Sequence, residues 1–279
     1  MLDVVMDTII DVLKIFPFLF LSFLIIELIE HKFNNKSVKL IEKSGRFGPL
    51  IGGILGCFPQ CGFSVMATNL YVTRIISLGT LISVYLSTSD EMLPILISRG
   101  SSIGEIIEIL LVKVLIGIIS GFVIDFILRK KQKLEIHEMC ENDHCHCEKG
   151  IISSSLVHTF RTLFFIVVVS FLLNIVMYFG GEDILRSLFG KNNIFSPFIA
   201  SLIGLIPNCC ASVVITELYL SNILSFSSVV AGLLTGSGVA LIVLFKSNNN
   251  IKENIMILIT VYFIGALSGV VLDLLKFII

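Results

Sequence analysis

Apolar residues along this chain gather in long runs instead of alternating with polar ones. A run needs about 20 residues to cross a bilayer as a helix. Six runs reach that length, at residues 12–30, 77–98, 103–128, 156–179, 225–245 and 251–277. Two further runs, 49–73 and 197–221, are long enough but are interrupted by prolines. The pattern predicts an all-α, polytopic membrane protein.

The first run does not have the charges of a cleaved signal peptide. Its start carries Asp3, Asp7 and Asp11 where a signal peptide has basic residues, and its apolar stretch is longer than a signal peptide needs. We therefore expect the run to stay in the protein as a membrane helix.

The chain also repeats itself. At an offset of 148 residues, 27 of the 79 positions from Pro49 to Ile127 are identical without a gap. Duplication of a membrane unit is typical of transporters, with the substrate site at the repeat interface. We expect three regions, which are a first membrane repeat at 1–128, a linker at 129–151 and a second membrane repeat at 152–279.

Lysine and arginine positions predict how the halves are oriented. If 49–73 and 197–221 are re-entrant hairpins, the loops on one side carry thirteen Lys and Arg against four on the other; single crossings would give ten against seven. The hairpins obey the positive-inside rule better. Each half then has three full spans and one hairpin, so the halves are inverted, with the linker in the cytoplasm and both termini outside. Ordinary crossings kinked by proline are the alternative.

Composition confirms that the bilayer is the expected solvent. The 279 residues are 55% hydrophobic and 15% charged, with a mean hydropathy of +0.98, whereas soluble domains contain about 25% charged residues. A net charge of −1 provides no field for nucleic acid. We expect membrane lipid as a partner and no nucleic acid, and self-association into homo-oligomers stays open.

The two hairpin tips contain residues able to bind a metal. They read FPQCG and IPNCC, and each hairpin arm has about 12 residues, or ~18 Å of helix, which reaches the membrane midplane. Thiolates beside amide oxygens suit a transition metal or trivalent arsenic. The candidates are Cys57, Gln60, Cys61, Asn208, Cys209 and Cys210, with Thr68 and Thr216 as supporting hydroxyls. The alternative is that these cysteines are small buried hydrophobes.

Carboxylates inside the predicted spans form a second candidate set. Asp90 and Glu91 lie near mid-depth of 77–98, and Glu217 lies in the second hairpin opposite Asn69 of the first. A carboxylate in a membrane is costly, so we interpret these residues as cation or proton sites. The alternative for Asp90 and Glu91 is a pair at a helix end, at the membrane interface.

Other charged residues have simpler interpretations. Glu105 and Glu253 are equivalent under the repeat and begin a helix, where a carboxylate complements the macrodipole. Asp125 and Asp273 are equivalent near helix ends, where we expect caps or contacts between the halves. Lys113, within 103–128, has no assigned role.

The linker contains the segment HEMCENDHCHCEKG. Its density of Cys and His resembles a metal-binding tract, although the spacing fits no defined zinc fold. Its thiols would be reduced in the cytoplasm. The candidate ligands are His137, Cys140, His144, Cys145, His146 and Cys147. A low-complexity loop with no role in transport is the alternative.

Two segments of the chain resemble the signatures of a known prokaryotic family. GCFPQCGFSVMATNLYVTRIISLGTLISVYLSTSDEMLPIL is similar to the first signature, and GLIPNCCASVVITELYLSNILSFSSVVAGLLTGSGVALIVLFK to the second. The family is named variously as arsenic efflux proteins, heavy-metal exporters or manganese transporters. The resemblance covers nearly the whole chain except the linker. It implies ten membrane segments, in agreement with six spans and four hairpin arms, and it does not select the ion.

These observations predict a secondary transporter of the cytoplasmic membrane that works by alternating access. It would export a heavy-metal cation, with manganese slightly favoured, or trivalent arsenic. No nucleotide-binding motif is present, so an ion gradient or a partner ATPase would supply the energy. We expect no enzyme activity and no resident cofactor. An intramembrane lipid-phosphate enzyme is one alternative, but neither tip has a cationic residue to hold phosphate. A thiol-redox membrane protein is another, but the chain has no CxxC.

Overall fold

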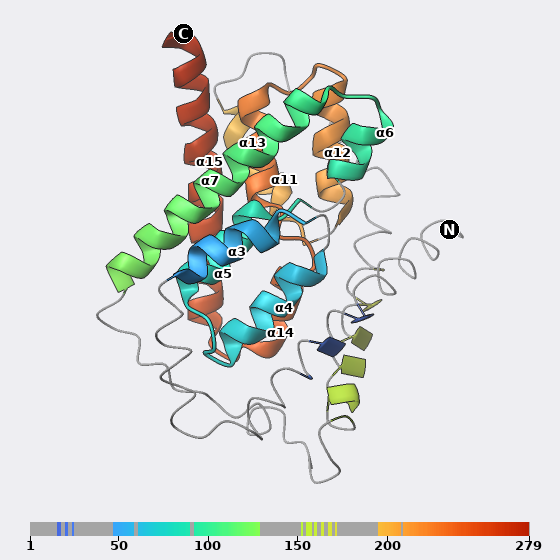
Figure 1. Ribbon diagram of the computed structural model, residues 1–279, viewed down its shortest axis with the longest axis vertical. Helices are drawn as coiled ribbons and strands as arrows, with labels where there is room; N and C mark the ends of the chain where they lie inside the picture. The colour runs from blue at the N-terminus through green and yellow to red at the C-terminus, as the bar shows by residue number, and fades with distance from the viewer. Residues whose placement is uncertain are drawn as a thin grey trace.

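The computed structural model describes residues 47–58, 61–89, 92–128, 195–207 and 209–278, with isolated helical residues within 16–24 and 152–171. All regular structure in these ranges is helical, which confirms the predicted all-α class (Figure 1). The linker and most of the predicted spans 12–30 and 156–179 lie outside the described residues. The division into three regions therefore stays a prediction.

Helices of the two halves correspond one to one. The first half contains α3 (Gly48–Gly56), α4 (Cys61–Val72), α5 (Leu78–Ser87), α6 (Met92–Ser98) and α7 (Ile103–Leu128). Their counterparts are α11 (Ser196–Gly204), α12 (Cys209–Leu220), α13 (Phe226–Thr235), α14 (Ala240–Ser247) and α15 (Ile251–Ile278). Each counterpart begins 148 residues later in the chain, so the sequence repeat is also a repeat of structure.

The same local signals start equivalent helices. Ser77 caps α5 by accepting a hydrogen bond from the backbone N–H of Thr80 at 3.1 Å. Ser225 caps α13 in the same way, from the N–H of Ser228 at 3.3 Å. A serine at this position satisfies a donor that the first helical turn leaves free. The helix starts are therefore encoded twice in the sequence.

Short helices fill the centre and two long helices lie outside them. All ten residues of α5 are buried, and so are nine of the ten in α13. The long helices α7 and α15, ~39 and ~42 Å, expose large apolar side chains at four-residue spacing, such as Leu111, Leu115 and Ile119 on α7. These exposed stripes suit contact with lipid.

Three helical stretches of the described chain are long and apolar enough to cross a membrane, namely Ile103–Leu128, Phe226–Ser247 and Ile251–Leu275. Their length and composition meet the ~20-residue requirement of a bilayer. Together with the exposed apolar stripes, they support a multi-pass membrane protein.

Glycines let the helices of one half cross closely. A Cβ atom on Gly121 of α7 would lie 2.5 Å from the carbonyl oxygen of Gly79 in α5 and 2.8 Å from Cβ of Pro49 in α3. The equivalent Gly269 of α15 would meet Cβ of Pro197 at the same 2.8 Å. Small residues at such crossings are typical of membrane helix packing.

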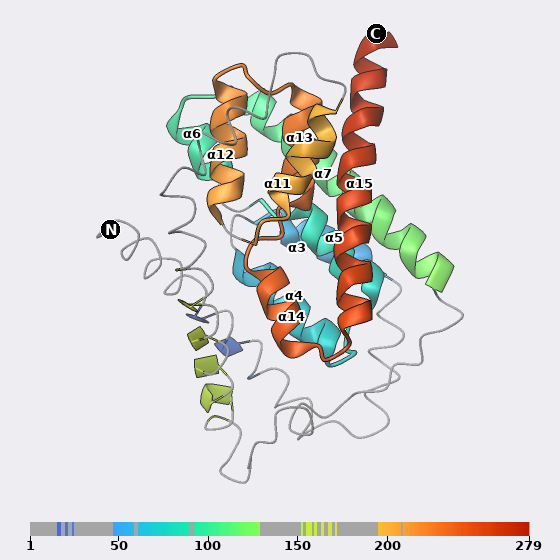
Figure 2. The same ribbon diagram turned by 180° about the vertical axis from the view of Figure 1, so that it is seen from behind.

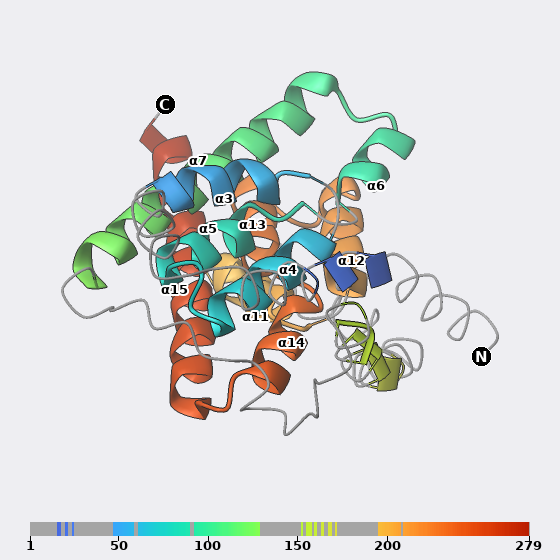
Figure 3. The same cartoon turned by 60° about the horizontal axis from the view of Figure 1, so that its bottom comes forward.

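Contacts between the halves are reciprocal. Helix α4 of the first half packs on α14 of the second, and α12 of the second half packs on α6 of the first. Figures 2 and 3 show both pairs, with α5 and α13 meeting between them. Each half therefore completes its packing with helices of the other.

Two spans that the sequence predicted as continuous are broken in the structure. The run 77–98 divides into α5 and α6, and the run 225–245 divides into α13 and α14. Hydroxyl side chains at the first break can replace helical hydrogen bonds to the backbone. Glycines at the second break disfavour a helix because they lose more conformational entropy on folding than other residues. The interruptions expected at 57–60 and 205–208 are present. Helix α3 ends at Gly56 and α4 begins at Cys61, and likewise α11 ends at Gly204 and α12 begins at Cys209.

Candidate functional site

The break between α5 and α6 concentrates buried hydroxyl groups. Ser87 donates to the carbonyl of Ser83 at 2.8 Å, and Thr88 donates to the carbonyl of Val84 at 2.7 Å. Ser89 donates to the carbonyl of Ser87 at 3.1 Å. These side chains satisfy carbonyls of the last helical turn, which a membrane interior would otherwise leave unpaired.

Lys113 of α7 reaches the same break. Its side chain is only 1% exposed, and its ammonium group donates a hydrogen bond to the carbonyl oxygen of Thr88. Cys57, which follows the last residue of α3, is half-buried. A lysine inside a membrane protein is costly and is retained for function or a specific partner. The break therefore contains the amino group of a buried lysine.

The equivalent break between α13 and α14 is neutral. It consists of Gly236, Ser237, Gly238 and Val239. Gly238 has a φ of 55°, a left-handed conformation that glycine adopts without strain. The Ser237 hydroxyl is buried and has no hydrogen-bond partner in the described part of the chain. Val261 occupies the position equivalent to Lys113. The two breaks share their place in the fold and differ in chemistry.

The residues predicted as tip ligands are only partly described. Cys61 begins α4, and Cys209 and Cys210 begin α12, so their backbones lie at the breaks that the sequence predicted. Their side chains lie outside the described residues. The same holds for Gln60, Asn208, Asp90, Glu91 and the linker residues His137, Cys140, His144, Cys145, His146 and Cys147. Their roles stay predictions.

The predicted supporting hydroxyls are buried in the core. Thr68 donates to the carbonyl of Ser64 at 2.7 Å and lies 2.6 Å from the hydroxyl of Tyr85. That hydroxyl lies 3.5 Å from the carbonyl of Ala240, at the start of α14. Thr216 donates to the carbonyl of Ser212 at 2.7 Å. Thr68 thus belongs to a polar contact that joins α4 and α5 to the break of the other half.

Glu217 lies away from the helix breaks. Its carboxylate accepts hydrogen bonds from Arg99 at 2.8 and 3.1 Å, at a partly exposed position. It is eight residues from Cys209 along α12, or ~12 Å. Its repeat equivalent Asn69 is buried in α4. The structure therefore brings Glu217 to an arginine and not to the Ser–Thr cluster of the first break.

The repeated aspartates form contacts within their own halves. Asp125 accepts hydrogen bonds from the Ser77 hydroxyl at 2.6 Å and from the Gly79 N–H at 2.8 Å. Asp273 accepts a hydrogen bond from the hydroxyl of Ser227. Each aspartate thus supports the first turn of the neighbouring helix, as an anion at a helix N-terminus does.

Among the described residues, no group of three or more His, Cys, Asp or Glu side chains could hold a metal. One apolar cavity of ≈ 320 Å³ lies between α3, α4 and α5. Its only polar lining comes from Ser77 and Thr80. A metal site needs several thiolate, imidazole or oxygen ligands. Two hydroxyl side chains are too few, so this cavity does not suit an ion.

An all-helical, multi-pass architecture built from two repeated halves, with polar helix breaks buried between them, defines a duplicated membrane protein. Residues 1–184 and 171–277 match the family model described as "Putative, 10TM heavy-metal exporter". The chain belongs to this family. No curated protein and no solved structure matches the chain.

Proposed function

We propose that this protein is a secondary transporter that exports a heavy-metal ion across the cytoplasmic membrane by alternating access. The observation that carries the proposal is the pair of helix breaks at equivalent positions of the two halves, which follow α5 and α13. Broken backbone at membrane depth is tolerated where it lines a protein cavity, and broken helices at a repeat interface form the substrate sites of many transporters.

The halves are inverted relative to the membrane in this proposal. Helices α7 and α15 are equivalent under the repeat but run in opposite directions along the long axis of the molecule (Figures 1 and 2). The reciprocal packing of α4 on α14 and of α12 on α6 supports a two-fold relation. With the positive-inside charge distribution, this relation favours a cytoplasmic linker, external termini and re-entrant hairpins.

The proposed ion site lies at the break of the first half. Asp90 and Glu91 come two and three residues after Thr88 in the chain, so Lys113 contacts the segment that carries both carboxylates. One ammonium beside two carboxylates leaves a net charge of −1, which a divalent cation reverses. The tip residues Gln60, Cys61, Asn208, Cys209 and Cys210 supply further donors, whereas the carboxylate of Glu217 is already paired with Arg99.

Ligand chemistry separates the two candidate substrates. Carboxylates and carboxamides suit a harder divalent ion such as manganese, whereas several thiolates suit trivalent arsenic. The buried ammonium at the first break needs carboxylates as counter-ions in a low dielectric. This requirement favours the carboxylate site and therefore the divalent ion.

The proposal is tested by manganese uptake into everted membrane vesicles. We expect the double variant Asp90→Asn with Glu91→Gln to lose at least about tenfold of the flux, because the charged ligands are gone. Glu108→Gln is the matched control, since Glu108 lies on the exposed face of α7. Unchanged manganese flux in the double variant would show that the carboxylate site is wrong.

The cysteines provide the second arm of the same assay. Cys61→Ser with Cys209→Ser should reduce manganese flux less than the carboxylate variant does. If this variant instead abolishes resistance to arsenite and leaves manganese flux unchanged, trivalent arsenic is the substrate. Measuring both ions in both variants therefore assigns the ion class.

We further propose that the Cys/His linker captures metal on the cytoplasmic side. Replacing Cys140, Cys145 and Cys147 with serine should lower flux at low metal concentration and leave the maximal rate unchanged, because only capture is impaired. A flux that is equal at all concentrations would show that the linker has no role in transport.

A further inference from the structure

Two equivalent hydrogen bonds join the halves at opposite ends of the molecule. The Tyr71 hydroxyl donates to the carboxylate of Glu253, and the Tyr219 hydroxyl donates to the carboxylate of Glu105. Both partners of the second bond are the repeat equivalents of the first. In Figure 1 the α4–α5 loop and the start of α15 lie at the bottom, and the α12–α13 loop and the start of α7 lie at the top.

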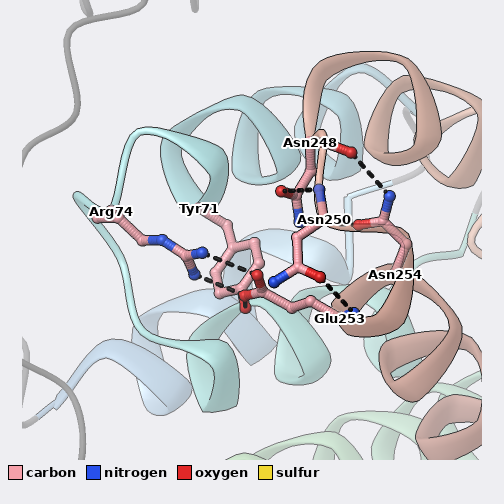
Figure 4. Close-up of polar contacts among 6 residues, drawn as sticks. All are labelled: Tyr71, Arg74, Asn248, Asn250, Glu253 and Asn254. Carbon is pink, nitrogen blue, oxygen red and sulfur yellow. Dashed lines mark hydrogen bonds and ion pairs between the residues drawn. The ribbon is translucent and has the colours of Figure 1, made fainter. Parts of the chain in front are cut away.

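At the first end an arginine completes the contact (Figure 4). Arg74 donates to Glu253 from both terminal guanidinium nitrogens, at 2.6 and 2.8 Å, which is a bidentate ion pair. Its guanidinium carbon also lies 5.1 Å from the centre of the Tyr71 ring. The side chains are 30% exposed for Arg74 and 14% for Glu253, so water screens the pair only in part. We call Tyr71, Arg74 and Glu253 the clamp.

The backbone on both sides holds the clamp in place. Arg74 has a φ of 61°, in the left-handed region that is unfavourable for a non-glycine residue. The Asn250 side chain caps α15 by accepting from the Glu253 N–H at 3.3 Å. Asn248 and Asn254 bond to each other at 2.8 Å beside it (Figure 4). A strained backbone conformation of this kind persists only where contacts with the surrounding residues hold it in place, and such positions are often functional.

The clamp also keeps its own charge. Hydrogen bonds from Arg74 to Glu253 raise the pKa of the guanidinium above its ordinary value. The same hydrogen bonds hold the pKa of the Glu253 carboxyl below its ordinary value, so both partners of the ion pair stay charged near neutral pH.

The second end lacks this ion pair. Asn222 replaces Arg74 at the equivalent position, with nearly the same φ of 57°. Ser102 replaces Asn250 as the cap, accepting from the Glu105 N–H at 3.2 Å. The arginine of this end, Arg99, pairs with Glu217 instead, and the two side chains are 61% and 32% exposed. The two ends thus keep the Tyr–Glu bond and differ in the charge that reinforces it.

We propose that the clamp is the stronger of two gates between the halves, and that it biases the protein toward the state closed at the clamp end. This inference rests on the proposed transport by alternating access. Opening one end of a two-fold assembly separates the residues that meet there, so the Tyr–Glu bond at that end must break. Loss of Arg74 lowers the free energy needed to open the clamp end and does not change the contacts at the other end. The sidedness of the charges puts the clamp at the cytoplasmic end.

The test exchanges the two equivalent residues. Arg74→Asn gives the clamp end the residue of the other end, and Asn222→Arg gives the other end the clamp. Hydrogen–deuterium exchange of the purified full chain in lipid nanodiscs reports opening at each end. Peptides that cover 71–76 and 248–256 report on the clamp end, and peptides that cover 219–224 and 99–106 report on the other end. No metal is added, so the measurement does not require transport.

We expect Arg74→Asn to speed exchange at the clamp end about two- to fivefold, the range of a partly exposed ion pair. Because opening one end closes the other, exchange at the far end should fall. Asn222→Arg should produce the opposite pair of changes, and the double variant should invert the wild-type bias. Lys252→Gln is the control, because it removes an exposed charge next to Glu253 and leaves the clamp intact.

Faster exchange at the clamp end without slower exchange at the far end would overturn the proposal, because it indicates only a lost structural contact. If Arg74→Asn does not fold, Arg74→Lys keeps the charge, loses the bidentate geometry and should give the same signs with smaller changes. Manganese flux in vesicles is measured separately. Reciprocal exchange without flux contradicts the transport function, and flux without reciprocal exchange contradicts the gate.

Discussion

The two central helix breaks occupy equivalent places and have different contents. The break between α5 and α6 carries three buried hydroxyl side chains and the ammonium of Lys113. The break between α13 and α14 carries two glycines and a serine, with Val261 in place of the lysine. The two halves repeat the same helices, but only the first break has ionisable residues at the positions compared, namely Lys113, Asp90 and Glu91. This difference supports the proposal of a single ion site, at the break of the first half.

The largest expected effect comes from placing a lysine beside the break between α13 and α14, at the position equivalent to Lys113. In Val261→Lys the new ammonium enters a buried position of α15, beside a break of glycines and serine. An unpaired charge at membrane depth costs about 3 kcal/mol or more. Thermal unfolding of the purified protein in detergent should show a large loss of stability.

The control for this variant is Val261→Met, which adds volume without charge. Similar destabilisation in both variants would attribute the loss to size, and would contradict the idea that the second break excludes charge.

Removing the charge from the first break should damage transport more than stability. In Lys113→Met the apolar part of the side chain is retained, the carbonyl of Thr88 loses its donor, and the nearby carboxylates lose their counter-ion. We expect manganese flux in vesicles to fall about tenfold, which corresponds to ~1.4 kcal/mol. Lys113→Arg, which keeps the charge, should retain more of the flux; equal flux in wild type and Lys113→Met would contradict the single charged site.

The shared frame predicts matched effects in the two halves. Gly121→Ala and Gly269→Ala each place a Cβ atom within 2.8 Å of Cβ of a proline in the neighbouring helix. Overpacking of this kind costs about 1–3 kcal/mol. The two variants should lower the melting temperature in detergent by similar amounts, and a strongly unequal pair would show that the halves are not packed alike.

The smallest effect is expected at Ser237. Its buried hydroxyl has no partner in the described part of the chain, so Ser237→Ala removes a polar group that gains nothing from burial. Melting temperature should stay the same or rise slightly. Thr235→Val is the contrasting variant, because Thr235 donates to the carbonyl of Ser201 at 2.8 Å, and it should cost about 1 kcal/mol.

Much of this fold could be predicted from the sequence because its signals are local or repeated. Apolar runs gave the helices, and the 148-residue offset gave their correspondence. The breaks at 88–91 (Thr-Ser-Asp-Glu) and 236–239 (Gly-Ser-Gly-Val) were missed because hydropathy averaged over a window hides a four-residue interruption inside an apolar run. Gly236 and Gly238 were the available signal, since glycine is unfavourable within a helix.

The site could be predicted less well. Lys113 was left without a role because its partner is a backbone carbonyl 25 residues away, which no pattern of side chains indicates. The clamp joins residues 179 and 182 positions apart. Glu253 was correctly placed at a helix start, but its contact with the other half depends on how the halves pack. The repetition of both the tyrosine and the glutamate was the signal for that contact.

The reciprocal packing of the halves also has a consequence for biogenesis. Helix α4 leaves the ribosome about 170 residues before its partner α14 is made. During that interval the face of α4 that α14 will cover, including the polar side chain of Thr68, has to be sheltered by lipid, by the insertion machinery or by other helices. The first half therefore cannot reach its final packing on its own. Its maturation waits for the end of translation, and truncated chains should be recognised as unassembled by membrane quality control.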